Sequence, residues 1–68
     1  MAEIIGHFLA VDHGPNGVGF EVALCGRNLG RLFAITYRPT HEAALQEAAA
    51  EAERRGGLEI VDMLAVNA

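Results

Sequence analysis

The clearest pattern of hydrophobic and polar positions lies in residues 40–57, where apolar residues recur with helical spacing. Four of them fall at i, i+3, i+4 and i+7, which places them on one helix face: Leu45, Ala48, Ala49 and Ala52. Thr40 is a favourable N-cap residue, and Gly56 and Gly57 can adopt the left-handed conformation that ends a helix. The pattern predicts one helix with a face made almost entirely of alanine, which allows a close approach to its neighbours.

The stretches on either side of this helix have the pattern of β-strands. Residues 18–25 alternate large apolar positions with small or polar ones, and residues 3–11, 32–37 and 58–66 are apolar runs of strand length. The segment Pro15-Asn16-Gly17 is a strong turn signal between the first two strands. The predicted order of elements is therefore β-β-β-α-β.

The lengths of the connections predict how the strands pair. Short turns make the first three strands antiparallel, whereas the helix returns the chain so that the fourth strand runs parallel to the first. We therefore expect an α+β fold: a four-stranded mixed sheet, in the order 3-2-1-4, with one helix on one face. Residues 1–68 are expected to form a single domain of this kind.

One helix covers only one face of such a sheet. The large apolar side chains suit the alanine face of the helix: Phe20, Val22, Leu24, Phe33 and Ile35. The opposite face then carries a second apolar set: Ile4, Phe8, Ala23, Cys25, Leu32 and Ala34. A monomer rarely exposes so much apolar surface, so the sequence predicts a homo-oligomer, a two-fold dimer in the simplest case, joined through this face.

Composition supports association and limits the other partners. A chain of 68 residues has a small core, and Cys25 is its only cysteine, so disulfides within the chain cannot stabilise it. The formal net charge is -4, which makes non-specific binding to nucleic acid or to a membrane surface unexpected. No apolar run approaches the roughly 18 residues of a membrane span, and the first residues lack the basic region of a signal peptide. We expect a cytoplasmic protein, and no motif indicates a bound cofactor.

Polar residues gather at two opposite ends of the predicted sheet. One end carries residue types suited to metal binding or acid–base chemistry: Asp12, His13, Arg38, His41 and Glu42. No known ligand spacing is present, so solvated loop and capping roles are favoured. The other end carries a candidate anion patch: Arg27, Arg31, Arg54 and Arg55. Because Arg55 is spaced to pair with Glu51 along the helix, ion pairing within the chain is favoured there.

Three carboxylates give the element order a second interpretation. Asp12 ends the first strand, Glu42 begins the helix and Asp62 lies in the fourth strand, which resembles the first half of the ribonuclease H-like fold. The resemblance implies a site for two metal ions. However, Asp62 lies in mid-strand and the further strands and helices of that fold are missing. Since two-metal chemistry needs converging carboxylates, we predict no metal site.

The helix start carries a narrower resemblance. The segment Thr40-His41-Glu42-Ala43-Ala44-Leu45 resembles the Thr-x-Glu-Glu-Ala-Leu opening of HicB-like antitoxin modules, matching at Thr40, Glu42, Ala44 and Leu45. The resemblance implies a truncated ribonuclease H-like core that has no catalytic function and binds a small toxin protein. The DNA-binding segment usual in that family is absent, so operator binding is not implied.

These observations predict a small non-enzymatic protein-interaction module that self-associates. The first alternative is an inhibitor or antitoxin-like protein, encoded by a phage or another mobile element, which binds a partner protein. Its binding surface would be a sheet edge or the acidic helix face around Glu47 and Glu51. The second alternative is a degenerate metal-dependent nuclease fold.

Overall fold

A computed structural model describes residues 7–26 and 30–66 of the chain. The first strand, predicted from residue 3, begins at residue 7 in the described part, and Ile4 and Arg27 lie outside that part. The elements follow in this order: β1 (His7–His13), the short 3-10 helix η2 (Pro15–Gly17), β2 (Phe20–Gly26), β3 (Gly30–Arg38), α1 (His41–Arg54), β4 (Glu59–Asp62) and α2 (Met63–Val66).

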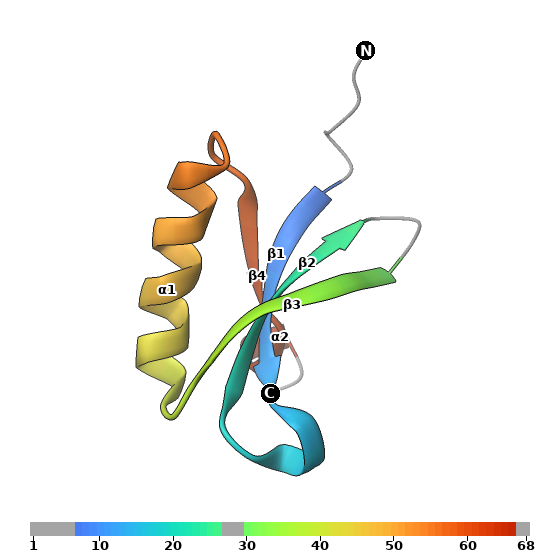
Figure 1. Cartoon of the computed structure of the whole chain (residues 1–68), viewed down its shortest axis with the longest axis vertical. Coiled ribbons are helices and arrows are strands. Elements are labelled where there is room, and N and C mark those ends of the chain that lie inside the picture. The colour runs from blue at the N-terminus through green and yellow to red at the C-terminus, as the bar shows by residue number, and fades with distance from the viewer. Residues whose placement is uncertain (1–6, 27–29, 67–68) are drawn as a thin grey trace.

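The sheet has the predicted topology. Its four strands lie in the order β3-β2-β1-β4, with β1–β2 and β2–β3 antiparallel and β1–β4 parallel (Figure 1). The turn before β2 has the chemistry expected of it, because Asn16 and Gly17 both adopt positive φ, at 58° and 76°. The α+β class and the strand order are therefore confirmed.

The core beneath α1 is small and tightly closed. Val11 and Val22 are fully buried against Ala44 and Ala48 of the helix. Alanine lacks a bulky side chain, so the helix backbone lies close to the sheet. The predicted packing of an alanine face of the helix on the sheet is therefore confirmed, but the alanines that are buried differ from the predicted ones.

The buried helix residues follow a strict i, i+4 spacing: Ala44, Ala48 and Ala52. Ala49, which was predicted to be buried, is exposed, whereas Ala44 is fully buried. Leu45 is only partly buried at the side of the core. The sequence pattern was misleading because alanines occupy several adjacent helix positions. Residue type alone therefore does not distinguish the buried helix face from the faces beside it.

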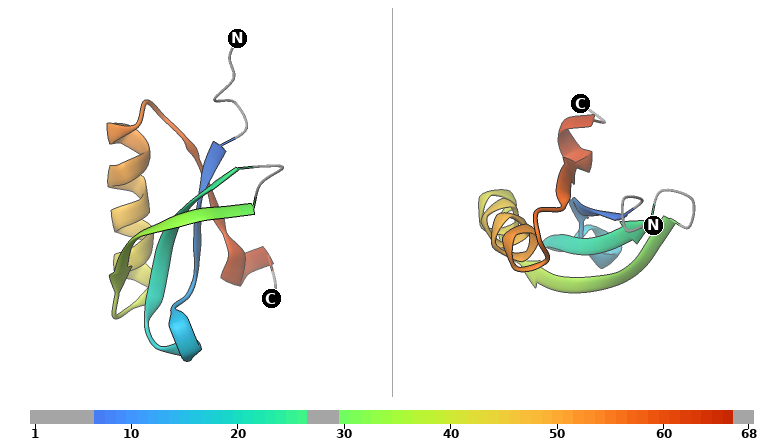
Figure 2. Two further views of the ribbon diagram at one scale, coloured as in Figure 1. Left: turned by 45° about the vertical axis from the view of Figure 1, so that its right-hand side comes forward. Right: turned by 90° about the horizontal axis from the view of Figure 1, so that it is seen from above.

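The last predicted strand is interrupted. Residues 58–66 were expected to be one strand, but β4 ends at Asp62 and α2 begins at Met63. The Asp62 carboxylate accepts a hydrogen bond from the backbone N–H of Leu64 at 3.1 Å, which helps to start the turn of helix. Figure 2 shows α2 on the side of the sheet away from α1. Part of the second sheet face is therefore covered by the chain itself.

Strand β3 does not keep the alternation that its sequence predicts. Its pairing with β2 shifts register twice, so Leu32 and Ile35 have no partner in β2. Each shift adds one residue to β3 and re-aims the side chains around it. Phe33 remains paired with Leu24, but the first half of β3 diverges from α1 (Figure 1). Phe33 is consequently 49% exposed instead of buried under the helix.

Candidate functional site

The sheet face away from α1 contains a hollow of about 280 Å³. Its floor is made of small buried residues, Ala10, Ala23 and Cys25, and Phe8 and Met63 pack beside them. It is lined by Phe8, Ala10, Asp12, Glu21, Ala23, Cys25, Gly30, Arg31 and Met63. The hollow is thus apolar along most of its length and carries charged groups towards one end.

An ion pair occupies part of this face. Nε and Nη2 of Arg31 donate to the two carboxylate oxygens of Glu21 at 2.6 and 2.8 Å, a bidentate geometry. Glu21 is only 8% exposed, and its hydrogen bonds raise the pKa of Arg31 above the usual value. A buried carboxylate is unfavourable without a partner, so Arg31 compensates the burial of Glu21.

A second carboxylate faces the first across the strands. Asp12 is the direct partner of Glu21 in the β1–β2 register, so the two acids share this face. Asp12 Oδ1 accepts a hydrogen bond from the backbone N–H of His13 at 2.8 Å. No basic side chain within residues 7–26 and 30–66 forms an ion pair with Asp12. The site therefore carries one charge that the described chain does not compensate.

Cys25 lies at the apolar end of the hollow. Burial raises the pKa of its thiol, and the nearby Arg31 opposes this rise only in part. The thiol is therefore protonated at neutral pH and behaves as a small apolar group rather than a nucleophile.

The predicted oligomer face proves to be partly occupied. Ala23 and Cys25 are already 1% and 6% exposed within the chain, because Phe8 and Met63 pack over their cluster. Ala34 is half-buried, and Leu32 falls at a register shift and is 39% exposed. The free apolar surface is thus smaller than the sequence predicts, since residues 58–66 were expected to be one strand and α2 was not predicted.

The predicted polar end is only partly assembled. His13 and His41 lie on either side of Phe20, with ring centroids 5.6 and 5.7 Å from it. His41 Nε2 also lies 2.9 Å from Oδ2 of Asp62, which joins the start of α1 to the end of β4. Oγ1 of Thr40 accepts a hydrogen bond from the backbone N–H of Ala43 at 3.1 Å, so Thr40 caps the helix as predicted. These contacts give the cluster a structural role at the helix start.

The other members of the polar end point elsewhere. Asp12 faces the hollow and Glu42 is exposed in the first turn of α1. Arg38 pairs with Glu47 of the helix at 3.2 Å. It also donates hydrogen bonds to Thr36 Oγ1 and, at 2.8 Å, to the Tyr37 carbonyl. The five predicted residues therefore do not form one site.

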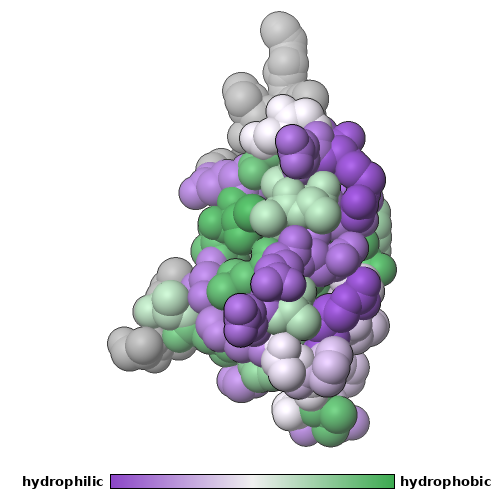
Figure 3. Space-filling view, turned by 90° about the vertical axis from the view of Figure 1, so that its left-hand side faces the viewer, coloured by the Kyte–Doolittle hydropathy of each residue, from purple (hydrophilic) through white to green (hydrophobic). Residues whose placement is uncertain are grey.

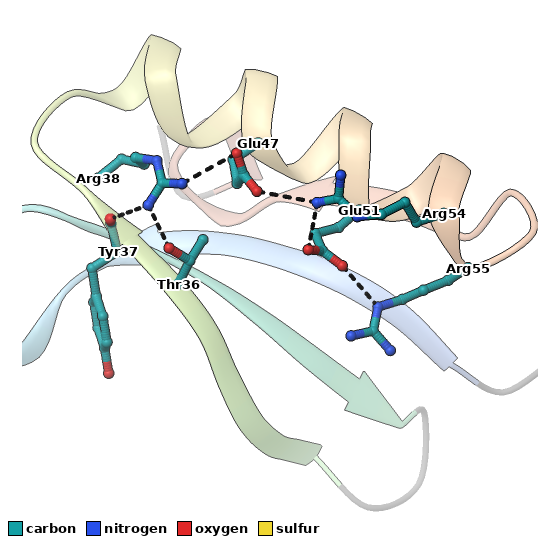
Figure 4. A network of polar contacts seen from close by, with 7 residues as sticks. All are labelled: Thr36, Tyr37, Arg38, Glu47, Glu51, Arg54 and Arg55. Carbon is teal, nitrogen blue, oxygen red and sulfur yellow. Dashed lines mark hydrogen bonds and ion pairs between the residues drawn. The ribbon is translucent and has the colours of Figure 1, made fainter.

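The predicted arginine patch is also divided. Arg31 lies on the far face of the sheet, whereas Arg54 and Arg55 pair with Glu51 at 2.6 and 3.1 Å. Arg54 reaches Glu47 as well, so ion pairs run along α1 (Figure 4). Figure 3 shows hydrophilic residues over much of the helix side. Arg31, Arg54 and Arg55 thus each have an acidic partner within the chain, although only the pairing of Arg55 with Glu51 was expected from the sequence.

A second hollow lies near the C-terminal end of α1. His7 lines this hollow of about 220 Å³ together with Leu24, Arg55 and Leu58. This hollow is on the helix side of the sheet, since Leu24 lies between Ala23 and Cys25, whose side chains face the other side. Leu24 also pairs with Phe33 of β3. The hollow adjoins the exposed part of β3.

The three carboxylates of the metal interpretation are not brought together. Asp62 is paired with Val11, whose side chain faces α1, whereas the neighbouring Asp12 faces the opposite side of the sheet. Successive residues of a strand point to opposite faces, which separates these two acids. Within the described residues, no group of three or more His, Cys, Asp or Glu side chains could hold a metal ion.

Comparisons of the chain with protein-family models, with curated proteins and with solved structures found no match. The similarity of residues 40–45 to HicB-like antitoxin modules therefore stays a prediction. Among the helices of residues 7–26 and 30–66, none is long and apolar enough to cross a membrane.

Sequence reasoning missed the Glu21–Arg31 pair and the contact between His41 and Asp62. A signal for the first was present, because Glu21 alternates with Val22 and so falls on the apolar far face. A charged residue there requires a partner, and the short β2–β3 connection makes a β3 arginine the natural one. The second contact spans 21 residues and depends on the packing of α1 against β4.

Proposed function

We propose that this protein is a small non-enzymatic protein-interaction module that self-associates through β3. The observation that carries the proposal is the exposure of large apolar side chains along one strand: Phe33 at 49% on the helix side, Leu32 at 39% at a register shift, and Tyr37 at 47% on the opposite face, where it pairs with Glu21. β3 is an outer strand of the sheet, and no other strand of the described part pairs with its free edge. Exposed apolar edge strands favour association with another chain.

The chemistry of this edge fits a second copy of the chain. Aromatic residues are enriched at the buried centres of protein interfaces. Phe33 lies beside Leu24, next to the hollow of about 220 Å³ on the helix side. In a two-fold dimer, an apolar side chain from each copy can enter the hollow of the other. The two register shifts of β3 disturb regular backbone pairing, so side-chain packing is the favoured mode of contact.

The alternative of an inhibitor or antitoxin-like protein that binds through its acidic helix face has less support. Glu47 and Glu51 were the acids expected to meet a basic partner. Both form ion pairs with arginines of the chain, so much of their charge is already compensated. A partner at the helix face would have to displace these contacts.

Light scattering of the purified protein at micromolar concentration tests the proposal. We expect a dimer, and we expect Phe33→Ser to weaken it at least tenfold, because burial of a phenylalanine contributes about 1.5–3 kcal/mol. Val18→Ser is the matched control, because Val18 is 73% exposed but lies between η2 and β2, outside β3. A strictly monomeric wild type, or equal effects of the two substitutions, would contradict the proposal.

A neighbouring residue distinguishes the two possible surfaces. Ala34 follows Phe33 and pairs with Ala23 on the face away from α1. If dimers form through that face instead, Ala34→Glu should dissociate them while Phe33→Ser leaves them intact. Association through the helix side of β3 predicts the reverse order of effects.

A further inference from the structure

Two parallel rows of side chains run across the hollow on the far face of the sheet. The β1–β2 register pairs them one to one, and each row reads apolar residue, alanine, carboxylate: Phe8, Ala10 and Asp12 in the β1 row, and Cys25, Ala23 and Glu21 in the β2 row. All six residues line the hollow. The two rows therefore offer closely similar surfaces side by side.

The β2 row is already occupied by an arginine. Arg31 is the β3 partner of Cys25, yet its guanidinium binds Glu21, which lies four residues away along β2. Its aliphatic stem therefore runs along the strands past the level of Ala23 and its β3 partner Ala34. The chain itself thus shows that an arginine beside such a row can reach along the strands to its carboxylate.

The β1 row has the same sequence of groups without the cation. The Asp12 carboxylate receives only the backbone N–H of His13, and no basic side chain of the described residues pairs with it. Asp12, Glu21 and Arg31 together leave one net negative charge at this end of the hollow. Like charges directly opposite each other across two strands are unfavourable, so a second cation at Asp12 would relieve the repulsion.

We infer that the β1 row is a binding site for an arginine side chain presented by a partner protein. Its stem would lie over Ala10 beside Phe8 and Met63, and its guanidinium would bind Asp12. The apolar floor excludes water and strengthens the charged contact. The net charge of -4 also favours the approach of a basic partner. This inference rests on the proposed role as an interaction module, but it uses a surface other than the helix side of β3.

The test is an NMR titration of the isotope-labelled full chain with the peptide acetyl-Gly-Ala-Arg-Ala-Gly-amide. The same peptide with citrulline in place of arginine is the matched probe, because citrulline keeps the shape and lacks the charge. We expect saturable shifts at Ala10, Asp12 and Met63 with the arginine peptide. Binding should be at least tenfold weaker with the citrulline peptide and with the Asp12→Asn variant, as is usual when a charge-assisted hydrogen bond is removed.

Glu53→Gln is the control for net charge, because Glu53 is an exposed acid of α1. This variant should bind the arginine peptide as the wild type does. The inference is overturned if no saturable shifts arise at the hollow with millimolar peptide. Equal binding of the two peptides, or equal weakening by Asp12→Asn and Glu53→Gln, would overturn it too, since these results indicate non-specific attraction.

Translational diffusion measured in the same samples reports self-association separately. A monomer that binds the arginine peptide contradicts the proposed dimer and supports the arginine site. A dimer that shows no shifts at the hollow contradicts only the arginine site. If resonances of Ala10 and Asp12 move on dilution of the protein alone, a second copy covers the hollow, and the inference of a free arginine site fails.

Discussion

At the residue scale, the pair Asp12 and Glu21 stands out because it places two carboxylates directly opposite each other. Glu21 is buried and compensated by Arg31, but Asp12 keeps its charge without a basic partner in the described chain. An arrangement that lowers the stability of the free protein is typical of binding sites, where the missing group comes from a ligand.

Replacing Asp12 by asparagine should therefore stabilise the free protein. The amide oxygen can still accept the hydrogen bond from His13, while the repulsion towards Glu21 is lost. We expect the free energy of unfolding to rise by about 0.2–1 kcal/mol, the usual range for cross-strand pairs. Urea unfolding at neutral pH measures this change.

Glu53→Gln is again the control, and it should leave the midpoint of unfolding nearly unchanged because Glu53 is exposed. A lower stability of the Asp12→Asn variant would show that Asp12 has a structural partner that the described chain does not reveal.

At the element scale, the packing of α1 on the sheet depends on alanines at particular helix positions. Ala44 and Ala48 are fully buried on Val11 and Val22, whereas Ala49 is exposed. There is no room for a larger side chain at Ala44 or Ala48, because the helix backbone lies close to the sheet there.

The substitution Ala48→Leu should accordingly overpack the contact and lower the free energy of unfolding by about 1–3 kcal/mol. Ala49→Leu introduces the same side chain one position along the helix, on its exposed side. It should change stability by no more than about 0.5 kcal/mol. Denaturant midpoints of the two variants decide the matter, and a reversed ranking would refute the helix phase described above.

At the scale of the whole molecule, a chain of ion pairs connects the end of β3 to the last turn of α1. It runs from Arg38 through Glu47, Arg54 and Glu51 to Arg55 (Figure 4). The hydrogen bond from Arg54 holds the pKa of Glu51 below its usual value, with a smaller contribution from Arg55, although partial burial opposes them.

This network predicts how stability depends on pH. Because the pKa of Glu51 is lowered in the folded state, its contribution is present above the ordinary glutamate pKa of about 4.3 and is lost as the pH falls through the lower folded value. Urea unfolding of the wild type should therefore show a steeper loss of stability below about pH 4.3 than that of Glu51→Gln. Glu53→Gln should retain the wild-type slope, and identical slopes for all three proteins would contradict this role of the network.

The sequence by itself determined the order of the elements, the pairing of the strands and the position of the main helix. These features follow from local signals: the helical spacing of apolar residues after Thr40, the turn at Pro15–Gly17, and short connections that leave few topologies. Each signal lies within a few residues, so it can be interpreted without knowledge of the rest of the molecule.

Only the tertiary structure decided which surfaces are free and which charges are compensated. The register shifts in β3 exposed Phe33, and the interruption at Asp62 placed Met63 over the far face. The contacts of Arg31 and His41 join residues 10 and 21 positions apart, and they exist only because the folded sheet brings them together. The physical reason is that periodicity reports which side of an element is apolar, whereas burial and ion pairing depend on what packs against that side.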